Sequence, residues 1–582
     1  MTRFSNACGA LAVSASMVCA GAHAATHDRL FAYGFDSAPD APADVNEASR
    51  FLTQATFGPT ATDVARLTAL GYDAWIEEQL ARAPTLGAPA VEQVVNARTA
   101  AAQSVSQSQR IQRWYWQAAY APDQLRQRMA WALSQIFVIS DQSSAIGNYI
   151  VPMAGYYDML AKDAFAPYRT LLGDVTWHPM MGRYLSSFRN QKPSATTSPD
   201  ENYAREVMQL FSIGLVLRDM DFSPILSNGV EIPTYDQTTI THTAKVFTGF
   251  TWSDAPLNPP NFYGGGLTFA AQYAPMECFG TEHFPASGSG SNNMRHDITG
   301  DDGTTATPKT VVGGVTIPPN QTCAQDVGDE LDILAAHPNV PPFVSRQLIQ
   351  RFVTSNPSPQ YIERVAQVFD APGANLGDVI KAILMDDEAR HPPALASGDH
   401  YGKLREPILR LTAVWRAFNA QAQAPDAYGE VKMSAGNGQT SSFGQGPLES
   451  PTVFNFYEPD YQQPGPFADN DRYSPELQIL SEASAYSTGN SYYNFSAKAY
   501  VGMSNPPTDR PLIDLSSLTA NATSPAAMVA TIDKSLLYGT MSANMKATLT
   551  SMLANLNGAS AAEKAWSAIY VTMLSPEFAT QR

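Results

Sequence analysis

The pattern of hydrophobic and polar positions predicts a protein built mainly from helices. From Asn46 onward, apolar residues recur every three or four positions, which is the period of a helix with one buried face. Thr60 and Asp63 form a capping pair before one such run, and Gly71 is a natural stop after it. Residues 126–139 are apolar on nearly every side after a basic start, which predicts a central buried helix. Further helices are expected at residues 72–83, 159–172, 180–188, 329–336, 343–353, 361–369, 376–385, 406–418, 476–484, 526–537, 543–556 and 561–574.

Two regions interrupt the helical pattern. Residues 219–325 and 420–475 are rich in Gly, Pro and aromatic residues, and the aromatic content favours ordered loops over disorder. Alternating pieces at residues 309–312 and 315–317 predict a small antiparallel β element inside the first region. The expected fold class is therefore mainly α, with long ordered loops and a loop/β insertion at residues 219–325. A chain of 582 residues would ordinarily contain more than one domain.

The first residues show the three-part pattern of a secretory signal peptide. Arg3 precedes a small-residue, weakly apolar run, and Ala22-His23-Ala24 matches the small-x-small cleavage pattern. A membrane anchor is the alternative, but the run is shorter than the roughly 20 apolar residues that a spanning helix needs. We expect cleavage near Ala24, a linker at residues 25–45 and a periplasmic or extracellular location. No later stretch predicts a transmembrane segment.

Cysteine usage agrees with export. Cys8 and Cys19 would leave with the signal peptide, and Cys278 and Cys323 would remain. Two cysteines in an oxidising compartment predict one disulfide. Neither lies in a CxxC pair or beside clustered histidines, so a zinc site built on them is not expected.

Charge and motif content exclude several classes of function. The formal net charge is −17 with only 37 Lys and Arg, which disfavours nucleic acid as a partner. The sequence contains no GxSxG elbow, no P-loop and no GxGxxG that opens a helix. The sequence therefore offers little support for a nucleotide-dependent enzyme or a standard serine hydrolase.

The segment from Ser198 to Gly214 carries the strongest local signal. Ser198 and Glu201 predict a capping box at the start of a helix, and Gly214 predicts its end. At 100° per residue, the polar side chains fall on one arc: Glu201, Asn202, Arg205, Glu206 and Gln209. Such an arc is common on surface helices, with Glu201 and Arg205 as an i,i+4 pair. Alternatively, it lines a cleft and supplies groups for acid–base chemistry or for metal binding through carboxylates.

The histidines and two arginines offer further candidates. His178 and His337 precede prolines, a setting in which the ring commonly caps a neighbouring backbone group. His296 and Asp297 are a candidate metal-binding pair, although no HExxH or other ligand run accompanies them. Arg346 and Arg351 could bind a carboxylate or sulfate of a substrate, or form ion pairs that hold helices together.

Eleven segments, spread in order along the chain, carry a resemblance to a known family. They are residues 48–59 (ASRFLTQATFGP), 128–135 (RMAWALSQ), 157–160 (YDML), 178–185 (HPMMGRYL), 199–206 (PDENYARE), 247–250 (FTGF), 337–340 (HPNV), 346–351 (RQLIQR), 353–357 (VTSNP), 403–407 (KLREP) and 574–578 (LSPEF). Together they resemble the secreted bacterial family catalogued as domain of unknown function 1800. The resemblance covers residues 46–582 and implies a compact, multi-helix single unit in place of several domains. Where the family usually has Trp after FTG, this chain has Phe250.

The resemblance adds weight to the polar residues inside the matched segments. Members of the family look like frequent genomic neighbours of secreted sulfatase-like proteins, which implies a shared task on envelope or extracellular polymers. The first hypothesis is therefore an exported, hydrolase-like enzyme. Its candidate catalytic residues are Glu201, Glu206, Arg205 and His178, and its candidate substrate-binding residues are Asn202, Arg351 and Arg346. No cofactor is specified, and a divalent metal fits the carboxylates. The alternative is a non-catalytic binding or assembly protein that works with a sulfatase-like partner.

Overall fold

The computed structural model describes residues 41–256, 261–287, 293–300, 307–392, 401–433, 442–494 and 508–582. The expected signal peptide and residues 25–40 of the expected linker lie outside the described residues. Within these described ranges, every helix is too short or too polar to cross a membrane.

The N-terminal helices begin and end where the sequence places their caps. They are α2 (Val45–Ala55), α3 (Ala61–Leu70) and α4 (Tyr72–Ala81). The side chain of Thr60 accepts the N–H of Asp63, and Asp63 accepts the N–H of Thr60, so the predicted capping box is confirmed. Gly71 ends α3 with a φ of 84°, a backbone conformation that disfavours other residues.

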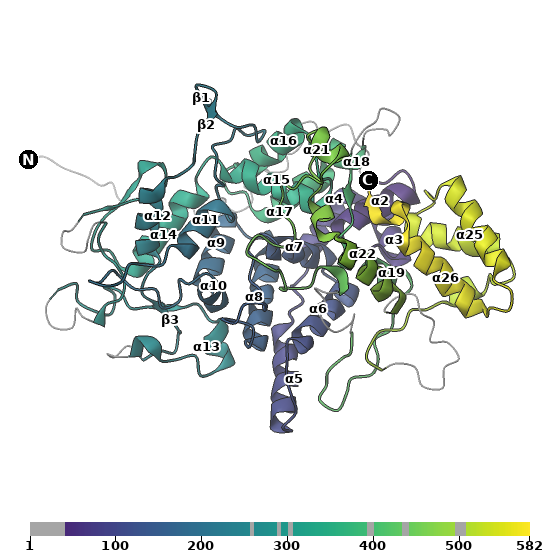
Figure 1. Cartoon of the computed structure of the whole chain (residues 1–582), viewed down its shortest axis with the longest axis horizontal. Coiled ribbons are helices and arrows are strands. Elements are labelled where there is room, and N and C mark those ends of the chain that lie inside the picture. Colours follow the sequence, from purple (N-terminus) through teal and green to yellow (C-terminus); the bar gives the residue numbers. More distant parts are fainter. Residues whose placement is uncertain are drawn as a thin grey trace, which may run out of the picture.

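A central group of helices forms the middle of the molecule (Figure 1). It contains α5 (Ala88–Ala100), α6 (Ser108–Tyr120), α7 (Gln124–Ser134) and α8 (Ile150–Lys162). Every residue of α7 is buried, as its apolar sequence predicts. The helix is shorter than expected, because residues 135–139 leave the helical path while remaining buried.

The single helix predicted for residues 159–172 is wrong. The chain instead forms α8, a 3-10 turn η2 (Asp163–Phe165) and a second helix, α9 (Tyr168–Trp177). Pro167 explains the break, because proline lacks an N–H and forces the preceding residue out of the helical region. Ala166 accordingly has extended backbone, with φ −76° and ψ 167°. His178 then begins the short helix α10 (Pro179–Tyr184).

The capping box predicted at Ser198 is also wrong. Helix α11 (Asn202–Gln209) starts later, with Glu201 in the N-cap position and no side-chain cap from it. Asp200 replaces Ser198, because its Oδ1 accepts the N–H of Asn202 at 2.8 Å.

The 219–325 region contains short strand pairs, as its alternating pieces predict, and also two helices that its sequence did not predict. Its elements are β1 (Leu226–Ser227), β2 (Val230–Glu231), α12 (Gln237–Val246), β3 (Phe250–Thr251), η3 (Asn261–Tyr263), α13 (Phe269–Tyr273), β4 (Glu277–Cys278), β5 (Lys309–Thr310), η5 (Val312–Gly314) and β6 (Thr316–Ile317). The pairs β1–β2, β3–β4 and β5–β6 are antiparallel. The predicted disulfide is present: Cys278 of β4 is joined to Cys323, the first residue of α14 (Cys323–Ala335).

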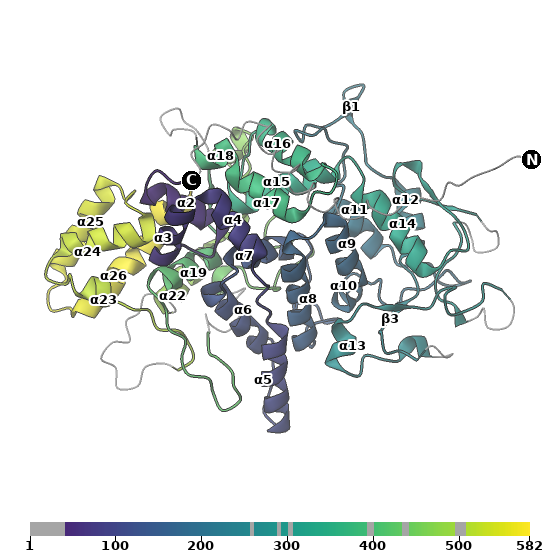
Figure 2. The same cartoon turned by 180° about the vertical axis from the view of Figure 1, so that it is seen from behind.

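The remaining chain returns through the centre and ends in a helical group at the opposite side from α12 and α14 (Figures 1 and 2). Its elements are α15 (Val340–Phe352), α16 (Pro359–Phe369), α17 (Leu376–Met385), α18 (Asp387–Arg390), β7 (Lys403–Leu404), α19 (Pro407–Ala417), α21 (Pro466–Asp469), η7 (Pro475–Ile479), α22 (Glu482–Tyr492), α23 (Ser516–Thr519), α24 (Pro525–Ile532), η9 (Asp533–Leu537), α25 (Ala543–Asn555), α26 (Ala561–Leu574), α27 (Pro576–Ala579) and β8 (Thr580–Gln581). The helix predicted at residues 476–484 is wrong, because Ser481 caps a new helix after the 3-10 turn.

One hydrophobic core runs through nearly the whole described chain. It extends from Ala48 in α2 to Phe578 in α27. Its buried residues come from the N-terminal helices, the central helices, the 219–325 region and the C-terminal part of the chain. The antiparallel pair β7–β8 also ties the segment at residue 403 to the C-terminus. The predicted single, mainly helical unit is therefore confirmed.

Candidate functional site

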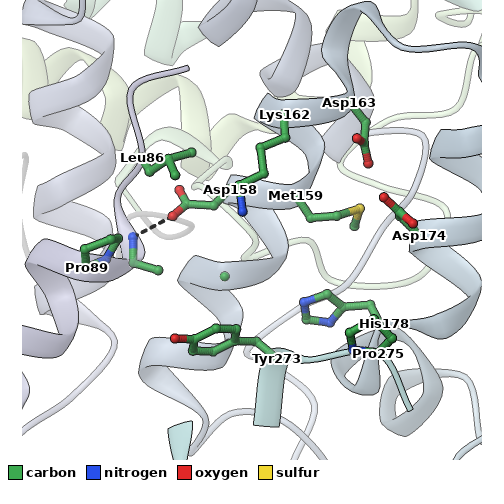
Figure 3. Close-up of a pocket in the computed structure, with 12 residues that line it drawn as sticks. Leu86, Pro89, Asp158, Met159, Lys162, Asp163, Asp174, His178, Tyr273 and Pro275 are labelled. Carbon is green, nitrogen blue, oxygen red and sulfur yellow. Dashed lines mark hydrogen bonds between the residues drawn. The ribbon is translucent and has the colours of Figure 1, made fainter. Parts of the chain in front are cut away.

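A cavity of about 330 Å³ lies beside α8, where several titratable side chains meet (Figure 3). Asp158 and Lys162 come from α8, Asp163 from the 3-10 turn, Asp174 from α9, and His178 from the start of α10. Apolar and small residues complete the lining: Leu86, Ala88, Pro89, Gly155, Met159, Tyr273 and Pro275. Lys162 and Asp174 are exposed, so the cavity opens to solvent on their side.

The local sequence explains how these groups come together. Positions 155, 158, 159 and 162 share one face of α8, because residues three and four apart lie above one another on a helix. The break before Pro167 then reverses the direction of the chain and brings α9 back beside the end of α8. Asp163 and Asp174 therefore meet across the break.

Asp163 and Asp174 form a carboxyl pair. Figure 3 shows the two groups turned toward each other. Burial, together with the neighbouring charge of Asp174, raises the pKa of Asp163 to about 7. Asp163 Oδ2 has no donor among the described residues. Two adjacent carboxyl groups cannot both ionise without strong repulsion, so Asp163 keeps its proton to a higher pH than an isolated aspartate does.

Asp158 has a different role from the carboxyl pair. Its two oxygens accept the backbone N–H groups of Gly87 and Ala88 at 2.7 and 2.8 Å, so it caps the N-terminus of α5 from outside. Burial raises the pKa of Asp158 to about 6, and the two backbone hydrogen bonds act in the opposite direction. Because both oxygens are occupied, we assign Asp158 to holding the wall of the cavity in place.

His178 is buried and neutral. Its Nδ1 accepts the N–H of Met180 at 3.2 Å, so the ring proton of the neutral form resides on Nε2. Burial lowers the pKa of His178 to about 3, assisted by the positive charge of Lys162. The ring also meets Tyr156 edge-on, with centroids 5.0 Å apart. His178 can therefore donate a hydrogen bond from Nε2 but does not carry a charge near neutral pH.

The other predicted catalytic residues lie outside this cavity. Glu201 accepts hydrogen bonds from Arg205 at 2.7 Å, from Gln237 at 3.0 Å and from Thr241 at 3.0 Å. These contacts match the surface-pair interpretation of the helix. Asn202 is exposed.

Glu206 is the least satisfied of the acidic groups on this helix. Its side chain is half-buried, and its Oε2 has no partner among the described residues. Burial raises the pKa of Glu206. It is not one of the residues that line the cavity.

The two predicted substrate-binding arginines are separated from each other. Arg346 forms an ion pair with the exposed Asp460 at 2.6 Å and packs between the rings of Phe222 and Tyr473. Arg351 lies in the core, only 1% exposed. Neither lines the cavity.

The candidate metal pair belongs to a buried network beside the disulfide. His296 Nε2 lies 2.9 Å from Asp326, which also binds Lys309, and Asp297 accepts the N–H of Thr299. Within the part of the chain that the structure describes, the one group of three potential metal ligands is Cys278, His296 and Cys323. Its two sulfur atoms are joined to each other, so they offer no thiolate to a metal ion.

Sequence reasoning missed both members of the carboxyl pair. Asp163 stands in the stretch that its apolar period assigned to one helix, residues 159–172, and Asp174 lies just after it; Pro167 was the signal that could have revealed the break. Asp158 and His178 stand inside segments that carry the family resemblance.

Comparison with known proteins identifies the family. A family model described as protein of unknown function (DUF1800) matches residues 50–580. No curated protein and no solved structure matches the chain. Because the family model covers most of the chain, from α2 to the final strand β8, the protein belongs to the DUF1800 family.

Proposed function

We propose that the protein is an exported hydrolase that acts on envelope or extracellular polymers through the carboxyl pair Asp163 and Asp174. The observation that supports this is the pair of carboxyl groups turned toward each other in a solvent-connected cavity. A carboxyl group with a pKa of about 7 can act as a general acid at neutral pH, and its ionised neighbour can act as a base. In this proposal, the pair takes the catalytic role that was predicted for Glu201 and Glu206.

The proposed reaction needs only water as a co-reactant. Asp174 acts as the base and accepts a proton from a water molecule. At the same time, the oxygen of that water attacks the electrophilic carbon of the scissile bond. The protonated Asp163 donates its proton to the leaving oxygen. The pair then still holds one proton, now on Asp174, and transfer of that proton to Asp163, directly or through solvent, restores the starting state. Lys162, exposed at the rim, would hold an anionic group of the polymer, and His178 Nε2 would donate a hydrogen bond to it.

The test is an activity screen of the protein purified after export. The substrates would be neutral, uronic-acid-bearing and sulfated polysaccharides, and the readout would be release of reducing ends. We expect Asp163→Asn and Asp174→Asn each to lose about 10²–10⁴ in kcat. Asp332→Asn is the matched control, because Asp332 is an exposed aspartate paired only with Arg169. Full activity in both cavity variants would contradict the assignment.

A second candidate function, a binding or assembly protein with a secreted sulfatase-like partner, is favoured by the surface of the 219–325 region. Leu267 is 88% exposed and Tyr263 is 58% exposed, which suits an interface better than free solvent. Mild purification from the native host tests it. Recovery of a partner in equal amount, with release by Leu267→Asp, would support this candidate over the enzyme.

A further inference from the structure

A buried polar cluster lies in the core and is separate from the carboxyl pair. We call it the core cluster and define it by residues from four segments: Arg128, Trp131 and Gln135 of the α7 segment, Arg351 of α15, Glu406 before α19, and Gln445, Asn455 and Tyr457 of the 442–457 loop. All are buried; Arg128, Arg351 and Tyr457 are each 1% exposed and Glu406 is 0% exposed. Three of the four segments carry the family resemblance.

The two arginines are held in place without being neutralised. Arg128 Nη2 donates to the carbonyl oxygen of Arg351 at 2.6 Å, and its guanidinium lies 4.8 Å from the ring centre of Phe352. The guanidinium of Arg351 lies 4.5 Å from the ring centre of Tyr457. Among the described residues, Nε and Nη1 of both arginines lack a hydrogen-bond acceptor. The structure also gives neither of them an ion pair within the ranges it describes.

The nearby carboxylate is fixed by other donors. Glu406 Oε2 accepts from Trp131 at 3.0 Å, from Gln135 at 2.9 Å and from Gln445. Glu406 Oε1 has no donor among the described residues, and the Tyr457 hydroxyl and Asn455 Oδ1 are also without partners there. Asn455 is joined to Gln135 at 3.3 Å. The core cluster therefore contains both hydrogen-bond donors and hydrogen-bond acceptors that lack partners among the described residues.

The charges of the core cluster do not cancel. Lys403 binds Glu476 at 2.8 Å, so those two neighbours neutralise each other. Arg128 lies within electrostatic range of both Glu406 and Arg351, so the cluster sets two guanidinium groups against one carboxylate, which leaves one positive charge in excess. A buried charge without a counter-ion, together with several unpaired polar atoms, destabilises the folded protein. Buried polar atoms in folded proteins are normally paired with protein, water or a bound group.

We propose that the core cluster is a binding site for a small, singly charged oxyanion that also carries a hydroxyl group. Guanidinium groups bind oxyanions through paired N–H donors, and two of them would supply the four open donor positions. The hydroxyl would donate to Glu406 Oε1. Dihydrogen phosphate and the carboxylate of a hydroxy acid share this chemistry, whereas sulfate has no hydroxyl to donate.

The experiment compares anions on the protein purified after export and dialysed into chloride. Thermal unfolding and calorimetric titration at constant pH and ionic strength would use phosphate, glycolate, sulfate and perchlorate, with long equilibration because the site is buried. We expect saturable binding and a raised Tm with phosphate or glycolate, and at least 10-fold weaker binding of sulfate. Binding of phosphate but not of glycolate would identify a phosphate as the ligand. Binding of glycolate but not of phosphate would identify a hydroxy acid.

Two variants test the assignment to the core cluster. Arg351→Lys retains the charge but loses the paired donors, and Tyr457→Phe removes only the open hydroxyl. We expect at least 10-fold weaker binding in Arg351→Lys and a smaller loss in Tyr457→Phe, whereas Arg169→Lys, at an exposed ion pair, should bind as the parent does. If Arg351→Lys does not fold, the anion affinity of Tyr457→Phe tests the assignment by itself. The proposal is overturned if no oxyanion binds or if binding is unchanged in the variants that fold.

Discussion

Replacing Asp163 with Asn should make the protein more stable at pH 8 but not at pH 5. In the folded protein, burial and the charge of Asp174 raise the pKa of Asp163 from 3.8 to about 7. The folded state therefore binds a proton that the unfolded state releases between these pH values. Stability from this group is fully present below pH 3.8 and is lost as the pH rises toward 7. Asparagine does not titrate, so the variant avoids this loss.

The magnitude follows from the size of the pKa change. Each tenfold difference in proton affinity corresponds to about 1.4 kcal/mol, so a rise from 3.8 to about 7 sets an upper limit of about 4 kcal/mol. Between pH 5 and pH 7 the change is limited to about 2.7 kcal/mol. Because Asp174 is exposed, solvent screens part of the repulsion, and we expect about 1–2 kcal/mol.

The assay is denaturant unfolding of the parent and the Asp163→Asn variant between pH 5 and pH 8. The difference in unfolding free energy should grow in favour of the variant as the pH rises and should level off above pH 7. Asp174→Asn should show the same trend with a smaller amplitude, because it removes only the repulsion. Asp332→Asn should show no such trend. A difference that stays constant from pH 5 to pH 8 would refute the shared proton and, with it, the proposed acid–base pair.

Three further predictions test the surroundings. Cys278→Ser with Cys323→Ser should lower the unfolding free energy by about 2–5 kcal/mol, because the disulfide closes a segment with a sequence separation of 45; equal Tm values with and without reductant in the parent would contradict it. His178→Asn should remove a rise in stability between pH 5 and about 6.5, because the folded ring, with its pKa lowered to about 3, stays neutral there while the unfolded histidine, with a pKa of 6.5, binds a proton; an unchanged slope in that range would count against a neutral His178. Glu201→Gln should change stability by less than about 1 kcal/mol and leave any activity intact, because its contacts are those of a partly exposed surface pair, so a loss of activity would return Glu201 to the candidate catalytic residues.

Capping residues and a regular apolar period in the sequence correctly predicted the bounds of some helices. Helices α17 and α26 begin and end as expected, because Asn375 and Ser560 cap them and their apolar period is regular. The error at Ser198 arose where two residues competed for the same cap, since Asp200 lies closer to the first turn.

The sequence could not predict which polar residues converge. Glu201, Arg205 and Glu206 share one helix face, so their grouping was visible, but this face lies at the surface. Arg351 and Glu406 are far apart in the sequence, and only the packing of α15 against α7 and the start of α19 brings them near Arg128. Which buried charges meet depends on the tertiary structure. The hydrophobic periodicity of the sequence does not contain this information.

The helix break at Pro167 determines both the fold and the candidate site. If residues 159–172 continued as one straight helix through Asp174, Asp163 and Asp174 would lie on nearly the same face but about 16 Å apart along the axis. They could not share a proton at that distance. The break costs backbone hydrogen bonds that a continuous helix would keep, and it places two carboxyl groups where their repulsion destabilises the fold at neutral pH. A protein that served only as a scaffold would gain stability from a continuous helix and from a neutral side chain at position 163. In the proposed hydrolase, this loss of stability is the cost of holding two carboxyl groups close enough to share a proton, and the proposed binding protein has no such need.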